Sequence, residues 1–126
     1  MDFLDRLIDY IEEHVHLDRH IRVGVLGSDK NSISIRPSPS QNTDRYGEGV
    51  TYEFNFQITM KGEMPHTLNK MHEITTLLDG LSNGDITSNN DSFELIRCEV
   101  STRPNWVEET DRGNHMYTAL FNAELE

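Results

Sequence analysis

The sequence is poor in several residue types, and each scarcity excludes a class of protein. Cys98 is the single cysteine in 126 residues, so no disulfide can form within the chain. A single cysteine is typical of proteins in a reducing compartment, or of proteins whose folding does not depend on the redox conditions. No apolar run approaches the roughly 20 residues that a transmembrane helix needs, and residues 1–14 are acidic where a signal or transit peptide is basic. We expect a soluble protein made in a cytoplasm.

Basic residues are also scarce. The chain has 11 Lys and Arg against 22 Asp and Glu, which gives a formal net charge of −11. Such a surface repels nucleic acid phosphates and anionic lipids, and no basic patch occurs in the linear sequence. These features disfavour nucleic acid binding and membrane binding, although separate basic residues could still gather in the folded chain or in an oligomer.

Apolar residues make up 35% of the chain and aromatic residues 8%. The length suits one domain, residues 1–126, and a chain of this size can bury a core of its own. The low apolar content predicts a thin core with much polar surface. This composition is compatible with a core completed by other subunits, although many monomers share it.

Two segments have the spacing of amphipathic helices. Apolar residues recur at steps of three and four from Asp2 to His16, and again from Pro65 to Leu81. Pro65 suits a first helical turn, and Gly84 lies just past the second segment. The two stripes consist of Phe3, Leu4, Leu7, Ile8, Ile11 and Val15, and of Leu68, Met71, Ile74, Leu77, Leu78 and Leu81.

Strand patterns predict five strands, at Arg22–Leu26, Ser32–Arg36, Val50–Lys61, Ser92–Arg103 and His115–Leu125. Turn-type residues 27–31 predict that the first two form a hairpin. The third has the clearest alternation and spans about 40 Å at about 3.4 Å per residue, so one end can project as an arm. In the fourth, the apolar parity switches between Leu95 and Ile96, which predicts a bulge or burial on both faces.

The element order is helix, hairpin, long strand, helix and two strands. Helices do not alternate regularly with strands, so a doubly wound parallel sheet is disfavoured. The order predicts an α+β fold, with a mostly antiparallel sheet of long strands packed by two helices on one face.

Two long loops are predicted, at residues 37–49 and 104–114, and large or basic residues lie in or beside them. Long loops in compact domains are often functional, and Arg, Tyr and Trp are frequent interface anchors. Alternatively, the Trp packs on the core and the arginines neutralise nearby acids. The candidate subunit or partner contacts are Arg36, Arg45, Tyr46, Arg103, Trp106 and Arg112.

The residues that could carry chemistry form no known catalytic or metal-ligand pattern. His14, His16 and His20 lie close together with acids nearby, and such pairs can bind a divalent metal. Three histidines at the end of a helix are also common without a metal. Cys98 lies within a predicted strand, where an inert thiol is the ordinary interpretation. No nucleophile elbow or phosphate-binding glycine pattern is present, so we expect no enzyme, no cofactor and no metal.

A series of short motifs, taken in order, resembles the small minor capsid proteins of the head–tail junction in long-tailed phages of Gram-positive bacteria. It begins with Tyr10-Ile11-Glu12 and continues with residues 33–40 and Asp44-Arg45-Tyr46-Gly47. It then includes Phe56-Gln57-Ile58 and Lys61, and closes with Arg103-Pro104-Asn105-Trp106-Val107, Glu109, Gly113 and Tyr117-Thr118-Ala119. Each piece alone is unspecific, and the series covers most of the chain.

This resemblance implies a virion protein of the tail-terminator type, with an α+β fold and neither catalysis nor a cofactor. Such proteins form rings, commonly of six subunits, that cap the tail tube and present a surface to the head connector. The implied partners are further copies of the chain, the tail tube protein and the connector protein. DNA would pass through the lumen without specific binding, helped by the acidic charge, and no membrane is involved.

Two other hypotheses stay open at the level of sequence. A monomeric or dimeric binding module could use the loop arginines and Trp106 on a peptide or an anionic ligand. A metal-dependent protein could be built on the His14, His16 and His20 cluster. Within the leading hypothesis, a terminator is not distinguished from another head–tail joining protein.

Overall fold

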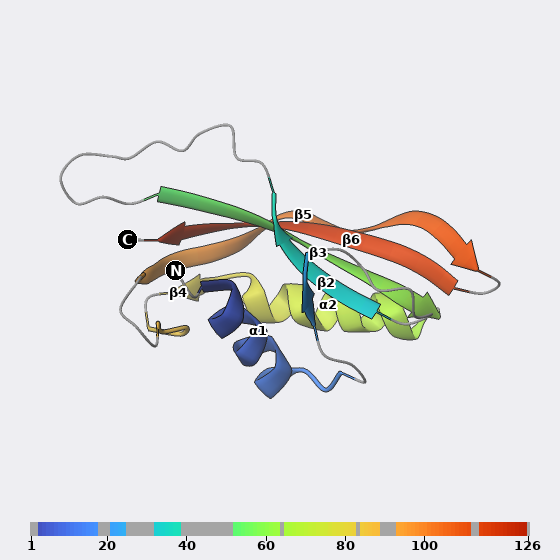
Figure 1. The fold of residues 1–126 in the computed structure, drawn as a ribbon, viewed down its shortest axis with the longest axis horizontal. Helices are drawn as coiled ribbons and strands as arrows, with labels where there is room; N and C mark the ends of the chain where they lie inside the picture. The colour runs from blue at the N-terminus through green and yellow to red at the C-terminus, as the bar shows by residue number, and fades with distance from the viewer. Residues whose placement is uncertain are drawn as a thin grey trace.

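The computed structural model describes residues 3–17, 21–24, 32–38, 52–63, 65–82, 84–88, 93–111 and 114–125. Within these ranges the chain forms two helices and a six-stranded sheet, and both helices lie on the same side of the sheet (Figure 1). The strand order is β1-β2-β3-β6-β5-β4, and every neighbouring pair except β1–β2 is antiparallel. The predicted α+β fold is therefore confirmed. In chain order the elements are α1 (Phe3–His14), β1 (Arg22–Val23), β2 (Ser32–Pro37), β3 (Tyr52–Glu63), α2 (His66–Leu78), β4 (Leu81–Ser82), β5 (Leu95–Asp111) and β6 (Asn114–Leu125).

The centre of the sheet is the pair β3 and β6, which run antiparallel over twelve residues each without a register shift. The alternation predicted from the sequence is confirmed, because Phe56, Ile58 and Met60 are buried towards the helices. Phe56 stacks on its cross-strand partner Phe121 with ring centroids 5.1 Å apart. Such a pair contributes about 0.5–1.5 kcal/mol beyond the area it buries.

The helices close the core from one side. Phe3, Leu7 and Ile11 of α1 are fully buried, and the predicted apolar stripe is confirmed. α2 buries Met71, Ile74 and Leu78 but ends at Leu78, earlier than predicted. The backbone N–H of Asp79 donates to the carbonyl of Thr75, and Gly80 then adopts a φ of +91°. This turn ends the helix, so Leu81 belongs to β4 rather than to α2.

The predicted hairpin between the first two strands is wrong. β1 and β2 run parallel, with Arg22 opposite Ser34 and Val23 opposite Ile35. A two-residue turn can join antiparallel strands only, whereas parallel strands need a longer connection. Turn-type residues mark a bend in the chain, but they do not show whether the strand after the bend runs parallel or antiparallel to the strand before it. Residues 27–31 themselves lie outside the described residues.

The predicted loop at 104–114 is also wrong, because β5 continues to Asp111 and pairs with β6 along the way. The predicted bulge near Leu95 is confirmed by a register shift between Leu95 and Arg97, and four further shifts follow. Each bulge moves the apolar parity by one residue, so no period of two survives in the sequence. Pro104 lies inside one of these irregular stretches, where proline is tolerated because no ladder hydrogen bond is lost.

Candidate interaction surfaces

The single thiol of the chain lies in the core. Cys98 is 1% exposed, and burial raises the pKa of its thiol to about 12, assisted by the negative charges of Asp79 and Glu99. A thiol in this state is a poor nucleophile at neutral pH, because the thiolate is the reactive form. This agrees with the interpretation of Cys98 as an inert core residue.

The candidate metal cluster is only partly within the described residues, since His20 lies outside them. The ring Nδ1 of His14 is 2.8 Å from the Tyr10 carbonyl oxygen, to which it donates, and the two rings lie 4.2 Å apart. A cleft of about 460 Å³ between α1 and α2 contains His14, His72 and Glu73. Glu73 is paired with Lys70 at 3.1 Å. The described part of the chain holds no group of three or more potential metal ligands.

Trp106 lies on β5 with 56% of its surface exposed, so the chain itself does not bury it. Its cross-strand partner Tyr117 is buried on the helix side of the sheet. Directly opposed residues share a face, so Trp106 also points to that side, but at the edge of the sheet. Its indole Nε1–H donates to Nδ1 of His115 at 3.0 Å. The adjacent Val107 is 43% exposed. This exposure favours the interpretation of Trp106 as an interface anchor over that of a core residue.

The predicted contact residues do not form one cluster. Arg36 lies on β2, whereas Arg103 and Trp106 lie on β5, and β3 and β6 separate these strands. Arg103 is exposed, and one of its guanidinium nitrogens lies 3.9 Å from Asp79 Oδ2. An exposed pair at this separation contributes little to stability. Arg45, Tyr46 and Arg112 lie outside the described residues.

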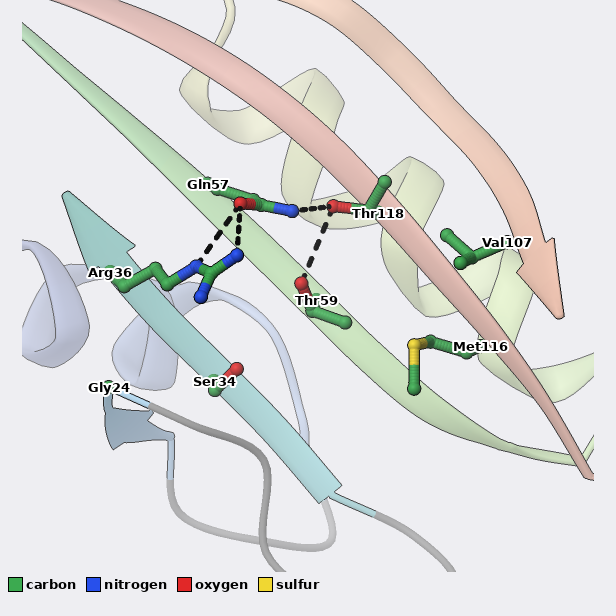
Figure 2. Close-up of a pocket in the computed structure, with 8 residues that line it drawn as sticks. All are labelled: Gly24, Ser34, Arg36, Gln57, Thr59, Val107, Met116 and Thr118. Carbon is green, nitrogen blue, oxygen red and sulfur yellow. Dashed lines mark hydrogen bonds between the residues drawn. The ribbon is translucent and has the colours of Figure 1, made fainter. Parts of the chain in front are cut away.

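A groove of about 300 Å³ crosses the face of the sheet that the helices leave uncovered (Figure 2). At one end, the Arg36 Nε and Nη2 atoms donate to Gln57 Oε1, both at 3.2 Å. Gln57 Nε2 in turn donates to Thr118 Oγ1 at 2.8 Å, and Thr59 Oγ1 lies 3.4 Å from the same oxygen. The apolar side chains of Val107 and Met116 line the other end.

No pattern in the sequence identifies Gln57, Thr59 and Thr118 as groove residues. They occupy the polar positions of two strongly alternating strands, and this period of two places them together on the face away from the core. Which strands are neighbours decides whether such positions meet, and that pairing could not be read from the sequence.

No helix in the described part of the chain is both long enough and apolar enough to span a membrane. The fold is a small α+β domain, and among the described residues its exposed large apolar side chains lie on the edge strands β1 and β5. The model of the bacteriophage tail terminator protein family matches residues 10–126, and the chain belongs to this family. It is therefore a structural component of a phage tail, and so of the virion. No curated protein sequence matches it.

The family match confirms the resemblance to tail terminators that the ordered motifs indicated, whereas the minor capsid and head–tail joining descriptions stay predictions. It begins within α1, at Tyr10, and includes every strand of the sheet. The host group and the long-tailed type of the phage stay predictions.

Proposed function

We propose that this chain assembles into a ring at the head-proximal end of the tail tube, where it caps the growing tube and presents a surface to the head connector protein. The family match over residues 10–126 is the observation that carries this proposal. A ring of six subunits is what the resemblance implies. The role requires neither catalysis nor a cofactor nor a metal, and the buried Cys98 thiol is consistent with this.

The shape of the sheet supports the proposal. A ring subunit needs two different faces that contact each other around a closed rotation. The sheet offers two different edges, one formed by β1 and β2 and the other by β5 with the short β4. The net charge of −11 supports free passage of DNA through the lumen, since an acidic wall repels the phosphate backbone.

Light scattering after size exclusion tests this function, with and without the polymerising tail tube protein of the same phage. We expect a ring, either from the chain alone or on tube ends, where electron microscopy should show one extra layer of density. A chain that stays monomeric and does not bind tube ends contradicts the proposal. Monomer alone does not, because tube ends can nucleate the ring.

The groove on the helix-free face favours a second candidate, a monomeric or dimeric binding module. Arg36 at its polar end would bind an anionic group, and Val107 and Met116 would contact an apolar one. In this case the chain stays monomeric or dimeric at high concentration and does not bind tube ends. It instead retains a discrete partner. Another head–tail joining role is distinguished by binding to the connector without binding to tube ends.

A further inference from the structure

Among the described residues, the large apolar side chains that are exposed lie at the two opposite edges of the sheet. Val23 on β1 is 55% exposed, and Trp106 and Val107 on β5 are 56% and 43% exposed. β2, β3 and β6 lie between these strands. A single exposed apolar residue needs no explanation. Exposed apolar residues at both free edges, however, are what we expect if another protein surface covers each edge.

Charges of opposite sign accompany these residues. At one edge, Arg22 precedes Val23, and Arg36 lies on β2 beyond the end of β1. At the other edge, Glu108 and Glu109 follow Val107. All four charged side chains are exposed. We name the first set (Arg22, Val23 and Arg36) the basic edge and the second (Trp106, Val107, Glu108 and Glu109) the acidic edge. No ion pair within the described ranges engages Arg22, Glu108 or Glu109.

Val23 and Trp106 lie on the same side of the sheet, whereas Val107 lines the groove of the helix-free face. Val23 is opposite Ile35, which is fully buried beneath the helices, so Val23 faces the helix side. Trp106 faces the helix side as well, because its partner Tyr117 does. When one basic edge meets one acidic edge and both helix layers stay on the same side, Val23 faces Trp106.

The charged members match on the other side. Arg22 is opposite Ser34, and Glu108 is opposite Met116; both partners line the groove of the helix-free face. The same edge-to-edge contact therefore brings Arg22 close to Glu108. Arg36, which also lines that groove, adds a second positive charge.

We propose that the basic edge of one copy of this chain binds the acidic edge of the next copy, with Val23 against Trp106 and Arg22 and Arg36 against Glu108. This inference rests on the proposed ring and assigns its subunit contact. The contact is heterologous, since the two edges differ, and successive heterologous contacts form a ring when the rotation closes. Charge complementarity makes a second copy the occupant, because each edge carries what the other lacks.

Side chains rather than a continuous main-chain ladder hold this contact. β4 covers β5 only at Arg97 and Cys98, and no described strand pairs with the rest of that edge. The edge is nevertheless broken by register shifts and by Pro104, which lacks an N–H donor. Such features limit unspecific strand addition at a free edge. The specificity of the contact then depends on the indole of Trp106 and on the charged side chains of the two edges.

Cross-linking between single-cysteine chains tests the proposal most sharply. In a Cys98→Ala background, one chain carries Arg22→Cys and another carries Glu108→Cys, and both are mixed with the tail tube protein under mild oxidation. We expect a cross-linked dimer in the mixture, and little or none from either chain alone. One chain carrying both cysteines should give a ladder. As a matched control, Thr76→Cys on the exposed side of α2 should not cross-link to Glu108→Cys.

Charge reversal supplies the second readout. Glu108→Arg with Glu109→Arg, or Arg22→Glu with Arg36→Glu, places like charges across the contact and should weaken assembly by about a hundredfold. All four changes in one chain should restore it. Folding of each variant is checked by circular dichroism and urea unfolding, and a variant that fails to fold is replaced by its single-charge reversals.

The outcomes separate this inference from the proposed function. If the wild-type chain caps tubes while the single-cysteine mixture gives no dimer and reversal changes nothing, the edge contact is wrong and the ring stands. If Arg22→Cys chains cross-link efficiently to one another, the contact is isologous and the proposal is overturned. If the wild-type chain neither assembles nor binds tube ends, the proposed function itself fails.

Discussion

Trp106 shows at the scale of one residue what the sequence could and could not predict. The residue type of Trp106 marked it as an interface candidate, whatever the local structure. Its exposure, however, depends on the local structure. A Trp in a loop can fold back on the core, whereas a Trp on an edge strand stays on one side of the sheet. The structure places it on β5, 56% exposed, with its indole hydrogen-bonded to His115.

Substitution of Trp106 should cost the subunit less stability than substitution of a core aromatic residue. We expect Trp106→Ala to lower the free energy of unfolding by about 1 kcal/mol, since more than half of the side chain is already exposed. Phe121→Ala should cost about 3–5 kcal/mol, because Phe121 is 1% exposed and stacks on Phe56. Urea unfolding of the two variants measures both values. A cost for Trp106→Ala comparable with that of Phe121→Ala would show that the indole belongs to the core.

Cys98 predicts an alkaline loss of stability. Burial raises the pKa of its thiol from 9.0 to about 12. Between these values the unfolded chain loses the thiol proton while the native chain keeps it, so the free energy of unfolding falls as the pH rises. The contribution of the protonated thiol to the free energy of unfolding is complete below pH 9. Above pH 9 it declines by at most about 1.4 kcal/mol per pH unit.

Urea unfolding at pH 8 and pH 10 measures this decline. Cys98→Ala is the matched variant, because every other titrating group is the same in both chains. We expect the wild-type chain to lose more stability than Cys98→Ala between the two pH values. Equal losses would mean that the native thiol titrates normally.

At the scale of elements, strictly periodic segments were predictable and irregular ones were not. α1 and β3 have one unbroken stripe or alternation each, and the structure places them within two residues of the predicted bounds. The second half of β5 was predicted as a loop, because three register shifts between Thr102 and Asp111 erase its alternation and because proline, here Pro104, is common in turns. The predicted direction of β1 relative to β2 was wrong, because a strand of two residues carries no signal of its direction. The groove and the paired edges depend on strand order, which periodicity does not contain.

The end of α2 depends on the backbone conformation of Gly80. A φ of +91° costs a residue with a side chain roughly 1–2 kcal/mol, and a Cβ placed at this position would meet no atom within 4 Å. Gly80→Ala should therefore destabilise the chain by about that amount through the backbone alone. Gly80→Asn should cost less, because asparagine tolerates this region better. Thermal unfolding compares the two, and equal stability of wild type and Gly80→Ala would show that the helix end has no such constraint.

At the scale of the whole molecule, the family match and the edges of the sheet are the observations behind the proposed assembly. The chain belongs to the tail terminator family over residues 10–126. Its apolar content of 35% is low, and among the described residues its exposed large apolar side chains lie on the edge strands β1 and β5. The acidic charge favours solubility, and the proposed pairing of basic with acidic edges would give the association its direction.

The central claim is that the assembled ring stops growth at tube ends, and tube length measures this directly. Tail tube protein is polymerised with increasing amounts of the wild-type chain, and lengths are measured by electron microscopy. We expect growth to stop when the chain suffices to cap the ends, which takes far less chain than tube protein. Lengths that are unchanged, or that fall only as the chain approaches equimolar amounts and sequesters free tube protein, would contradict the account.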